Sequence, residues 1–156
     1  MRPDPEDIHN LAGGAINIMF RLLLADDHAA MREKAIRVLE VDYSVIDAVS
    51  NGQEILDAES RTSPDAVILD ISMPIMTGLE AATRLKQRGS AAKIIFLTVH
   101  EEVAFLRAAL DAGAVGYVTK LRLATDLCLA VEEAMAGRIF VSPPLSLVKN
   151  GHLSLT

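Results

Sequence analysis

The sequence predicts a single α/β domain built on a doubly wound, five-stranded parallel sheet. Short runs of aliphatic and β-branched residues recur along the chain, for example at 66–69 and 94–97, and such runs are typical of strands buried on both faces. Each run is followed by a stretch in which apolar residues have helical spacing. This strict alternation of strand and helix favours a parallel sheet with helices on both faces.

The first two strand–helix units are expected between residues 19 and 61. The helix after the first strand places four apolar residues on one face: Met31, Ala35, Val38 and Leu39. An Asn-Gly turn separates the second strand from its helix, and a Ser-Pro pair ends that helix. The predicted strands are 19–25 and 43–49, and the predicted helices are 29–40 and 53–61.

Three further units complete five strands and five helices. The strands are predicted at 66–69, 93–97 and 115–118, and the helices at 78–87, 101–112 and 123–136. A glycine suited to stopping a helix follows each helix end: Gly89, Gly113 and Gly137. In the fourth helix the inward face is expected to hold Val103, Leu106, Ala109 and Leu110.

Composition and charge narrow the class of protein. The chain has 156 residues, 51% of them apolar, which suffices for one well-filled core. The net charge is −6 and Lys and Arg form no cluster, which argues against direct binding of this chain to DNA. The single cysteine, Cys128, excludes an intramolecular disulfide. No apolar stretch approaches the roughly 20 residues of a membrane span, and the acidic start is unlike a signal peptide, so a cytoplasmic protein is expected.

Three segments are expected along the chain. Residues 1–18 carry two prolines and a Gly-Gly pair without a sustained period, so we interpret them as an N-terminal extension. Residues 19–142 hold the five strand–helix units. Residues 143–156 are too few for a second folded domain, and we interpret them as a tail or as the start of a linker to an output domain.

Polar side chains follow four of the predicted strands. Asp26 and Asp27 come after the first strand, Asp70 after the third, Thr98 after the fourth and Lys120 shortly after the fifth. Because the carboxyl ends of parallel strands meet at one edge of a sheet, we expect these side chains to converge there. Three carboxylates, one hydroxyl and one ammonium in one place suit a divalent cation and a phosphoryl group.

The chemistry expected of this cluster is phosphoryl acceptance. Clustered carboxylates repel one another unless a cation such as Mg²⁺ neutralises them, and a carboxylate can act as nucleophile to form an acyl phosphate. Lys120 and Thr98 would then hold phosphoryl oxygens. Each residue also has a simpler interpretation: the aspartates and the threonine as helix caps or turn residues, the lysine as a solvated loop residue. The agreement of four strand ends favours the functional interpretation.

The residues that surround these positions resemble those of a known family. The stretches 23–28 (LLADDH), 69–78 (LDISMPIMTG), 97–98 (LT) and 116–120 (GYVTK) resemble the receiver domain of two-component response regulators, most closely the NarL/FixJ-type subfamily. The resemblance covers about residues 20–142. It implies a flavodoxin-like, CheY-like (βα)5 fold.

The resemblance also implies a role for each matching residue. Asp70 would be the phosphoacceptor and would receive the phosphoryl group from a histidine kinase. Asp27 and Asp70 would ligate Mg²⁺ directly, Asp26 would help through water, and the Ser72 backbone carbonyl would complete the protein ligands. Such a receiver catalyses only its own phosphorylation and dephosphorylation.

The resemblance further implies a switch. Thr98 and Lys120 would hold the phosphoryl group, and Tyr117 would be the rotating aromatic that reports the state to a protein-interaction surface on the fourth helix, fifth strand and fifth helix. A homodimer is one expected partner, and DNA would be reached only through an output domain. Leu121 stands where many receivers have a proline with a cis peptide.

Other classes of protein remain open. A haloacid-dehalogenase-like Mg²⁺ phosphatase also uses an aspartate nucleophile, but it would need a second aspartate where Ser72 stands. A flavin-binding protein would need a Gly- and hydroxyl-rich loop after the first strand, and none is present. A receiver that acts only as an interaction scaffold is a further class, and the intact set of Asp26, Asp27, Asp70, Thr98 and Lys120 argues against it. The N-terminal fragment of a DNA-binding transcriptional regulator is the other alternative.

Overall fold

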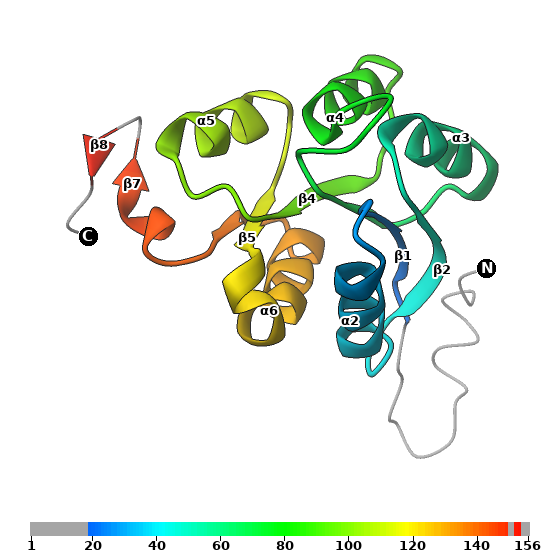
Figure 1. The fold of residues 1–156 in the computed structure, drawn as a ribbon, viewed down its shortest axis with the longest axis horizontal. Coiled ribbons are helices and arrows are strands. Elements are labelled where there is room, and N and C mark those ends of the chain that lie inside the picture. The colour runs from blue at the N-terminus through cyan, green and yellow to red at the C-terminus, as the bar shows by residue number, and fades with distance from the viewer. Residues whose placement is uncertain (1–18, 150–151, 154–156) are drawn as a thin grey trace.

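The computed structural model describes residues 19–149 and 152–153. Its main sheet has six strands in the order β2-β1-β3-β4-β5-β6, and every neighbouring pair is parallel. Helices cover both faces of this sheet (Figure 1). The predicted doubly wound α/β fold is confirmed, with a sixth strand that the sequence analysis did not include. The expected N-terminal extension, 1–18, lies outside the described residues.

The elements follow the predicted order, and their ends differ from the predicted ends by at most two residues. The strands are β1 (Arg21–Ala25), β2 (Ser44–Val49), β3 (Ala66–Leu69), β4 (Lys93–Thr98), β5 (Gly116–Thr119) and β6 (Phe140–Val141). The α-helices are α2 (Ala29–Leu39), α3 (Gly52–Thr62), α4 (Gly78–Gln87), α5 (Val103–Asp111) and α6 (Leu123–Met135). A short 3-10 helix, η2 (Lys120–Arg122), joins β5 to α6.

Alternate strand residues point to opposite faces, and each face therefore has its own core. On one face Leu23, Val67 and Phe96 pack with α3, α4 and α5. On the other face Leu24 and Ile68 pack with α2 and α6. Both cores are built mainly from aliphatic side chains that are almost fully buried. Burial of the strands on both faces explains why their sequences are continuous apolar runs.

One inward position was predicted wrongly. Leu110 of α5 is 38% exposed, whereas Leu106 and Ala109 are buried. Successive residues of a helix are turned by about 100°, so Leu110 lies at the edge of the buried face that Leu106 and Ala109 define.

The chain order around the sheet determines where a site can form. After β1 the chain moves outward to β2, then returns to the other side of β1 to form β3. The reversal opens a crevice at the carboxyl ends of β1 and β3, because their connections leave toward opposite sides of the sheet.

The chain after α6 adds structure beyond the five units. It forms β6 beside β5, the 3-10 helix η3 (Leu145–Leu147), and a two-stranded antiparallel pair, β7 (Val148–Lys149) and β8 (His152–Leu153). Leu145 is 5% exposed and packs in the core that α3, α4 and α5 share. No helix among the described residues is long and apolar enough to cross a membrane.

Candidate functional site

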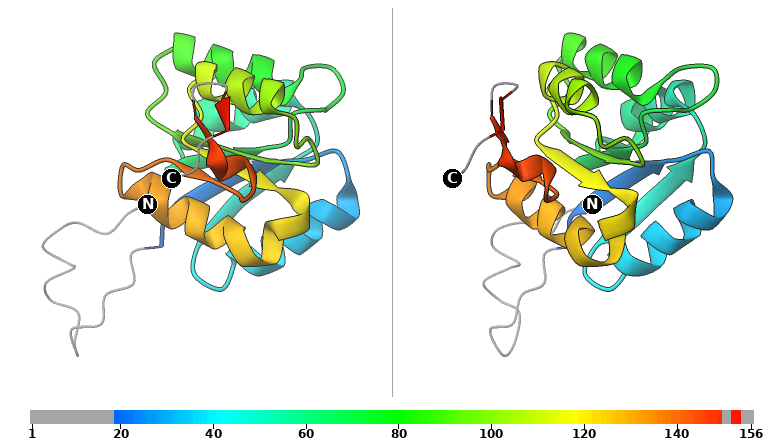
Figure 2. Two further views of the ribbon diagram at one scale, coloured as in Figure 1. Left: turned by 90° about the vertical axis from the view of Figure 1, so that its left-hand side faces the viewer. Right: turned by 60° about the vertical axis from the view of Figure 1, so that its left-hand side comes forward.

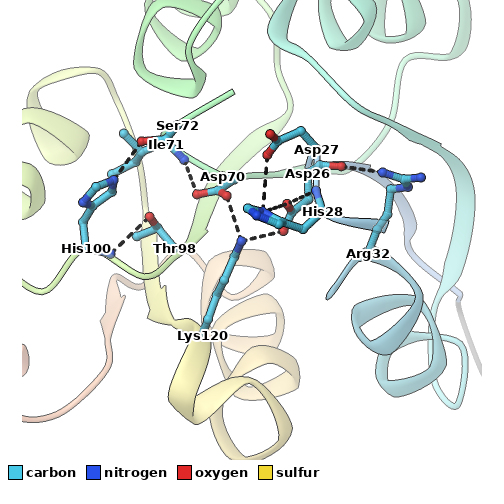
Figure 3. Close-up of polar contacts among 10 residues, drawn as sticks. All are labelled: Asp26, Asp27, His28, Arg32, Asp70, Ile71, Ser72, Thr98, His100 and Lys120. Carbon is cyan, nitrogen blue, oxygen red and sulfur yellow. Dashed lines mark hydrogen bonds and ion pairs between the residues drawn. The ribbon is translucent and has the colours of Figure 1, made fainter. Parts of the chain in front are cut away.

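The structure brings the strand-end residues together at one edge of the sheet. Asp26 and Asp27 follow β1, Asp70 follows β3, Thr98 ends β4, and Lys120 follows β5. Figure 3 shows Asp26, Asp27 and Asp70 close together, with the Lys120 side chain extending from η2 to Asp70 and Asp26. All of these side chains except that of Asp27 are buried. The convergence expected from the sequence is therefore present.

Lys120 joins the two buried carboxylates. Its Nζ lies 2.8 Å from Asp26 Oδ2 and 2.8 Å from Asp70 Oδ2. Burial lowers the pKa of Lys120, but hydrogen bonds to Asp26 and Asp70 outweigh burial, so that the pKa is raised above its ordinary value. The ammonium therefore stays charged. It offsets one of the two negative charges that it touches.

Asp27 adds a third carboxylate that Lys120 does not contact. Its side chain is 35% exposed, and its Oδ1 lies 3.5 Å from His28 Nδ1. One ligand atom from each of Asp26, Asp27, His28 and Asp70 lies within 4.8 Å of the others. Three carboxylates and one ammonium leave a formal charge of about −2, which matches a divalent cation. The donor set, mostly hard oxygen atoms, suits Mg²⁺.

The backbone holds Asp70 in place. The Ile71 N–H donates to Asp70 Oδ1 at 2.7 Å, and the Gly78 N–H donates to the Ile71 carbonyl at 2.8 Å. A Cβ at Gly78 would lie 1.9 Å from the Asp70 carbonyl oxygen. Only glycine allows the start of α4 to approach the residues after β3 so closely. The glycine in the stretch 69–78 therefore packs directly against the Asp70 backbone.

Ser72 and Thr98 flank Asp70 on the side away from Asp27 (Figure 3). A hydrogen bond of 2.8 Å joins Ser72 Oγ to His100 Nε2, and the His100 N–H donates to Thr98 Oγ1 at 3.4 Å. The His100 ring stacks on Phe105, with ring centroids 4.0 Å apart. These contacts tie the loop after β3 to the loop after β4.

Tyr117 is fully buried beneath the second of these loops. Its hydroxyl donates to the His100 backbone carbonyl at 2.7 Å. Burial and the nearby Glu102 carboxylate raise its pKa, so the hydroxyl keeps its proton and remains a donor. Tyr117 therefore contacts the loop that directly follows Thr98.

Two histidines, to which the sequence analysis assigned no role, lie near the site. The structure places His28 against Asp26 and Asp27, and His100 against Ser72. Adjacency to the Asp-Asp pair was the only feature that could have marked His28.

A cavity of about 370 Å³ opens beside Lys120. It lies between α2 and the loops after β4 and β5, and it is lined by Met31, Lys34, Val99, Glu101, Thr119, Lys120 and Leu121. Val99 and Leu121 are 65% and 89% exposed. The site thus has an open side that combines apolar and charged groups.

Comparison with known proteins places the chain in a family. The model of the response regulator receiver domain matches residues 22–132. The chain therefore belongs to the response regulator receiver domain family. Its relatives and structural neighbours include response regulators of the LuxR and NarL families.

Three comparisons illustrate the likeness. A putative transcriptional regulator of Pseudomonas aeruginosa is 36% identical over 122 residues, which cover 78% of this chain and 59% of that protein. The nitrate/nitrite response regulator protein NarL of Escherichia coli is 31% identical over 129 residues, which cover 81% of this chain and 60% of that protein. The crystal structure of a LuxR-family two-component response regulator from Aurantimonas has a TM-score of 0.78 and 35% identity, covering 82% of this chain and 93% of that one. The chain thus spans less than two thirds of the length of these two sequence relatives.

Proposed function

We propose that this receiver accepts a phosphoryl group on Asp70 from a histidine kinase, in the presence of Mg²⁺, and thereby switches a protein-interaction surface. The observation that carries the proposal is the position of Lys120. Its ammonium lies 2.8 Å from an oxygen of Asp70, at the carboxyl edge of the sheet and beside two further aspartates. A buried carboxylate with a fixed cation at this distance is suited to accept a phosphoryl group.

The residues fit a resident Mg²⁺ ion. Asp27 and Asp70 would ligate it directly, Asp26 would act through water, and the Ser72 carbonyl would complete the protein ligands. The chemistry that Mg²⁺ supplies when bound is neutralisation of negative charge on the phosphoryl oxygens. The formal charge of about −2 on the three carboxylates and Lys120 supports this assignment.

The side chains of the site perform the remaining steps. An oxygen of Asp70 forms the new bond to phosphorus, and the bond from phosphorus to the donor's histidine nitrogen breaks. Lys120 donates to the phosphoryl oxygens, and the Thr98 hydroxyl donates to another of them. Tyr117 then responds to the position of the loop that follows Thr98, since its hydroxyl donates to that loop at the His100 carbonyl.

The output would be a change in protein contacts. The surface around Tyr117, on α5, β5 and α6, would bind a partner protein or a second copy of this chain. Sequence relatives are transcriptional regulators by name. DNA would be reached through an output domain following residues 143–156, and transcription would be the process regulated.

Intact-mass spectrometry tests the proposal. After treatment with acetyl phosphate and Mg²⁺, we expect addition of a single phosphoryl group. Asp70→Asn should remove the addition, and Asp57→Asn, at an exposed position of α3, should not. Phosphoryl addition to the Asp70→Asn variant at the level of the unchanged chain would refute the assignment.

A further inference from the structure

The chain after α6 covers the outer edge of β5. We call residues 140–146 the strap. Phe140 and Val141 pair with Gly116 and Tyr117, and the Ser142 N–H donates to the Tyr117 carbonyl at 2.9 Å. Figure 2 shows this segment running alongside β5 before it turns toward η3. The strand that carries Thr119 and leads into Lys120 therefore borders this segment, not open solvent.

A buried polar network ties the strap to the start of α6. Ser142 is fully buried, and its Oγ donates to Asp126 Oδ2 at 2.8 Å. The same Oγ accepts the Thr119 N–H at 3.3 Å. Asp126 is 2% exposed and is also paired with Arg122, whose Nε lies 2.6 Å from Oδ2. Each of these buried groups has a partner, so the network holds one arrangement.

Apolar packing ties the other end of the strap to the core beneath the site. Leu145 is 5% exposed and belongs to the same core cluster as Tyr117, with Val141 packed against that cluster. The Ser146 N–H donates to the Ser142 carbonyl at 3.2 Å, which closes the turn between the two anchors. The strap therefore contacts β5 at Thr119 and the core at Tyr117.

We propose that Ser142 and Asp126 are positioning residues for Lys120. Through these two residues, the strap transmits the state of the site to the C-terminal end of the chain. The Thr119 amide, held by Ser142, immediately precedes Lys120. A phosphoryl group on Asp70 gives Lys120 additional fixed acceptors, which restrains Thr119 and, through it, Ser142. By linkage, a docked strap stabilises the phosphorylated site to the same extent. The inference rests on the proposed function.

Hydrogen exchange of the full chain, followed by mass spectrometry, tests the coupling. Beryllofluoride with Mg²⁺ is the phosphoryl probe, and fluorine NMR measures its binding separately. We expect the amides of 140–146 to exchange more slowly in its presence, by about fivefold or more. Ser142→Ala and Asp126→Asn should each reduce this difference while the probe still binds. Arg122→Gln is the matched control, because it removes an ion pair to Asp126 but leaves the Ser142 hydrogen bonds in place, and it should keep the difference.

The outcomes separate the two proposals. Failure of beryllofluoride to bind the unchanged chain would overturn the proposed function. Binding with unchanged or faster exchange of 140–146 would overturn the coupling alone. If Ser142 had a merely structural role, its loss would raise the exchange rate of 140–146 equally with and without the probe, and the difference between the two conditions would remain. An undiminished difference in Ser142→Ala and Asp126→Asn would therefore also refute the coupling. Since the first comparison uses the unchanged chain, poor folding of a variant would not prevent the test.

Discussion

Replacing Asp27 by asparagine should stabilise the protein when no divalent cation is present. Oxygens of Asp26, Asp27 and Asp70 lie within 4.8 Å of one another. Two unit charges at that separation repel by about 3–4 kcal/mol at an effective dielectric constant of about 20. Lys120 contacts Asp26 and Asp70 and offsets one of their two charges, but it does not contact Asp27. Because the Asp27 side chain is 35% exposed, solvent screens its repulsion, and we expect a gain of about 1–2 kcal/mol.

Magnesium should reverse the order of stability. A ligand at about 100 times its Kd stabilises the folded state by about 2.7 kcal/mol. The unchanged chain should receive this stabilisation, and Asp27→Asn should receive much less, because it lacks one of the two proposed direct ligands. The measurement is urea unfolding at one fixed pH, with MgCl₂ or with NaCl at equal ionic strength. Asp57→Asn, on the exposed side of α3, is the control and should respond to Mg²⁺ as the unchanged chain does.

Two results would refute this reasoning. If Asp27→Asn were less stable than the unchanged chain without Mg²⁺, repulsion among the carboxylates would not dominate at this position. If Mg²⁺ stabilised Asp27→Asn as much as it stabilises the unchanged chain, Asp27 would not be a direct ligand.

Three further predictions concern stability. Gly78→Ala should lower the free energy of unfolding in urea by about 3 kcal/mol, because the new Cβ would lie 1.9 Å from the Asp70 carbonyl oxygen. Its control, Gly137→Ala, should lose only about 1 kcal/mol, because φ is 81° there but nothing lies within 4 Å of the new Cβ; equal losses would contradict the steric argument. Ile75→Asn should raise the free energy of unfolding by about 1 kcal/mol, because Ile75 is 82% exposed and has a φ of 70°, a left-handed conformation that asparagine adopts more easily than isoleucine. An unchanged or lower urea midpoint would contradict the presence of backbone strain at this residue. Burial raises the pKa of the Tyr43 hydroxyl to about 12 in the folded state, whereas it is about 10 in the unfolded state, so the free energy of unfolding should fall as the pH rises from about 10 to 12. Urea midpoints should fall less steeply with pH in Tyr43→Phe, and equal slopes in the two proteins would count against the raised pKa.

Much of the fold and the location of the site could be predicted from the sequence, because both follow from local patterns. The strand Ala66–Leu69 is a continuous apolar run whose ends match the structure. Parallel strands bring their carboxyl ends to one edge, so the placement of Asp70 and Lys120 followed from their positions after β3 and β5 alone. Neither inference needed knowledge of long-range contacts.

Other features depend on contacts that no local pattern encodes. The strand β6 has two residues, and it forms because the edge of β5 offers backbone partners. The hydrogen bond from Ser142 to Asp126 depends on how the chain returns after α6. The direction of the His28 side chain toward Asp26 and Asp27 is likewise set by the start of α2, and periodicity carries no information about it. The roles of 1–18 and 143–156 stay predictions.

The residue that carries the phosphoryl group decides whether Asp70 is the phosphoacceptor. An aspartyl phosphate is reduced by borohydride to homoserine, and peptide mass spectrometry then identifies the modified residue. After treatment with acetyl phosphate and Mg²⁺, we expect homoserine at Asp70, and none at Asp26 or Asp27. Homoserine at either of those aspartates with Asp70 unchanged, or none at any of the three, would contradict this assignment.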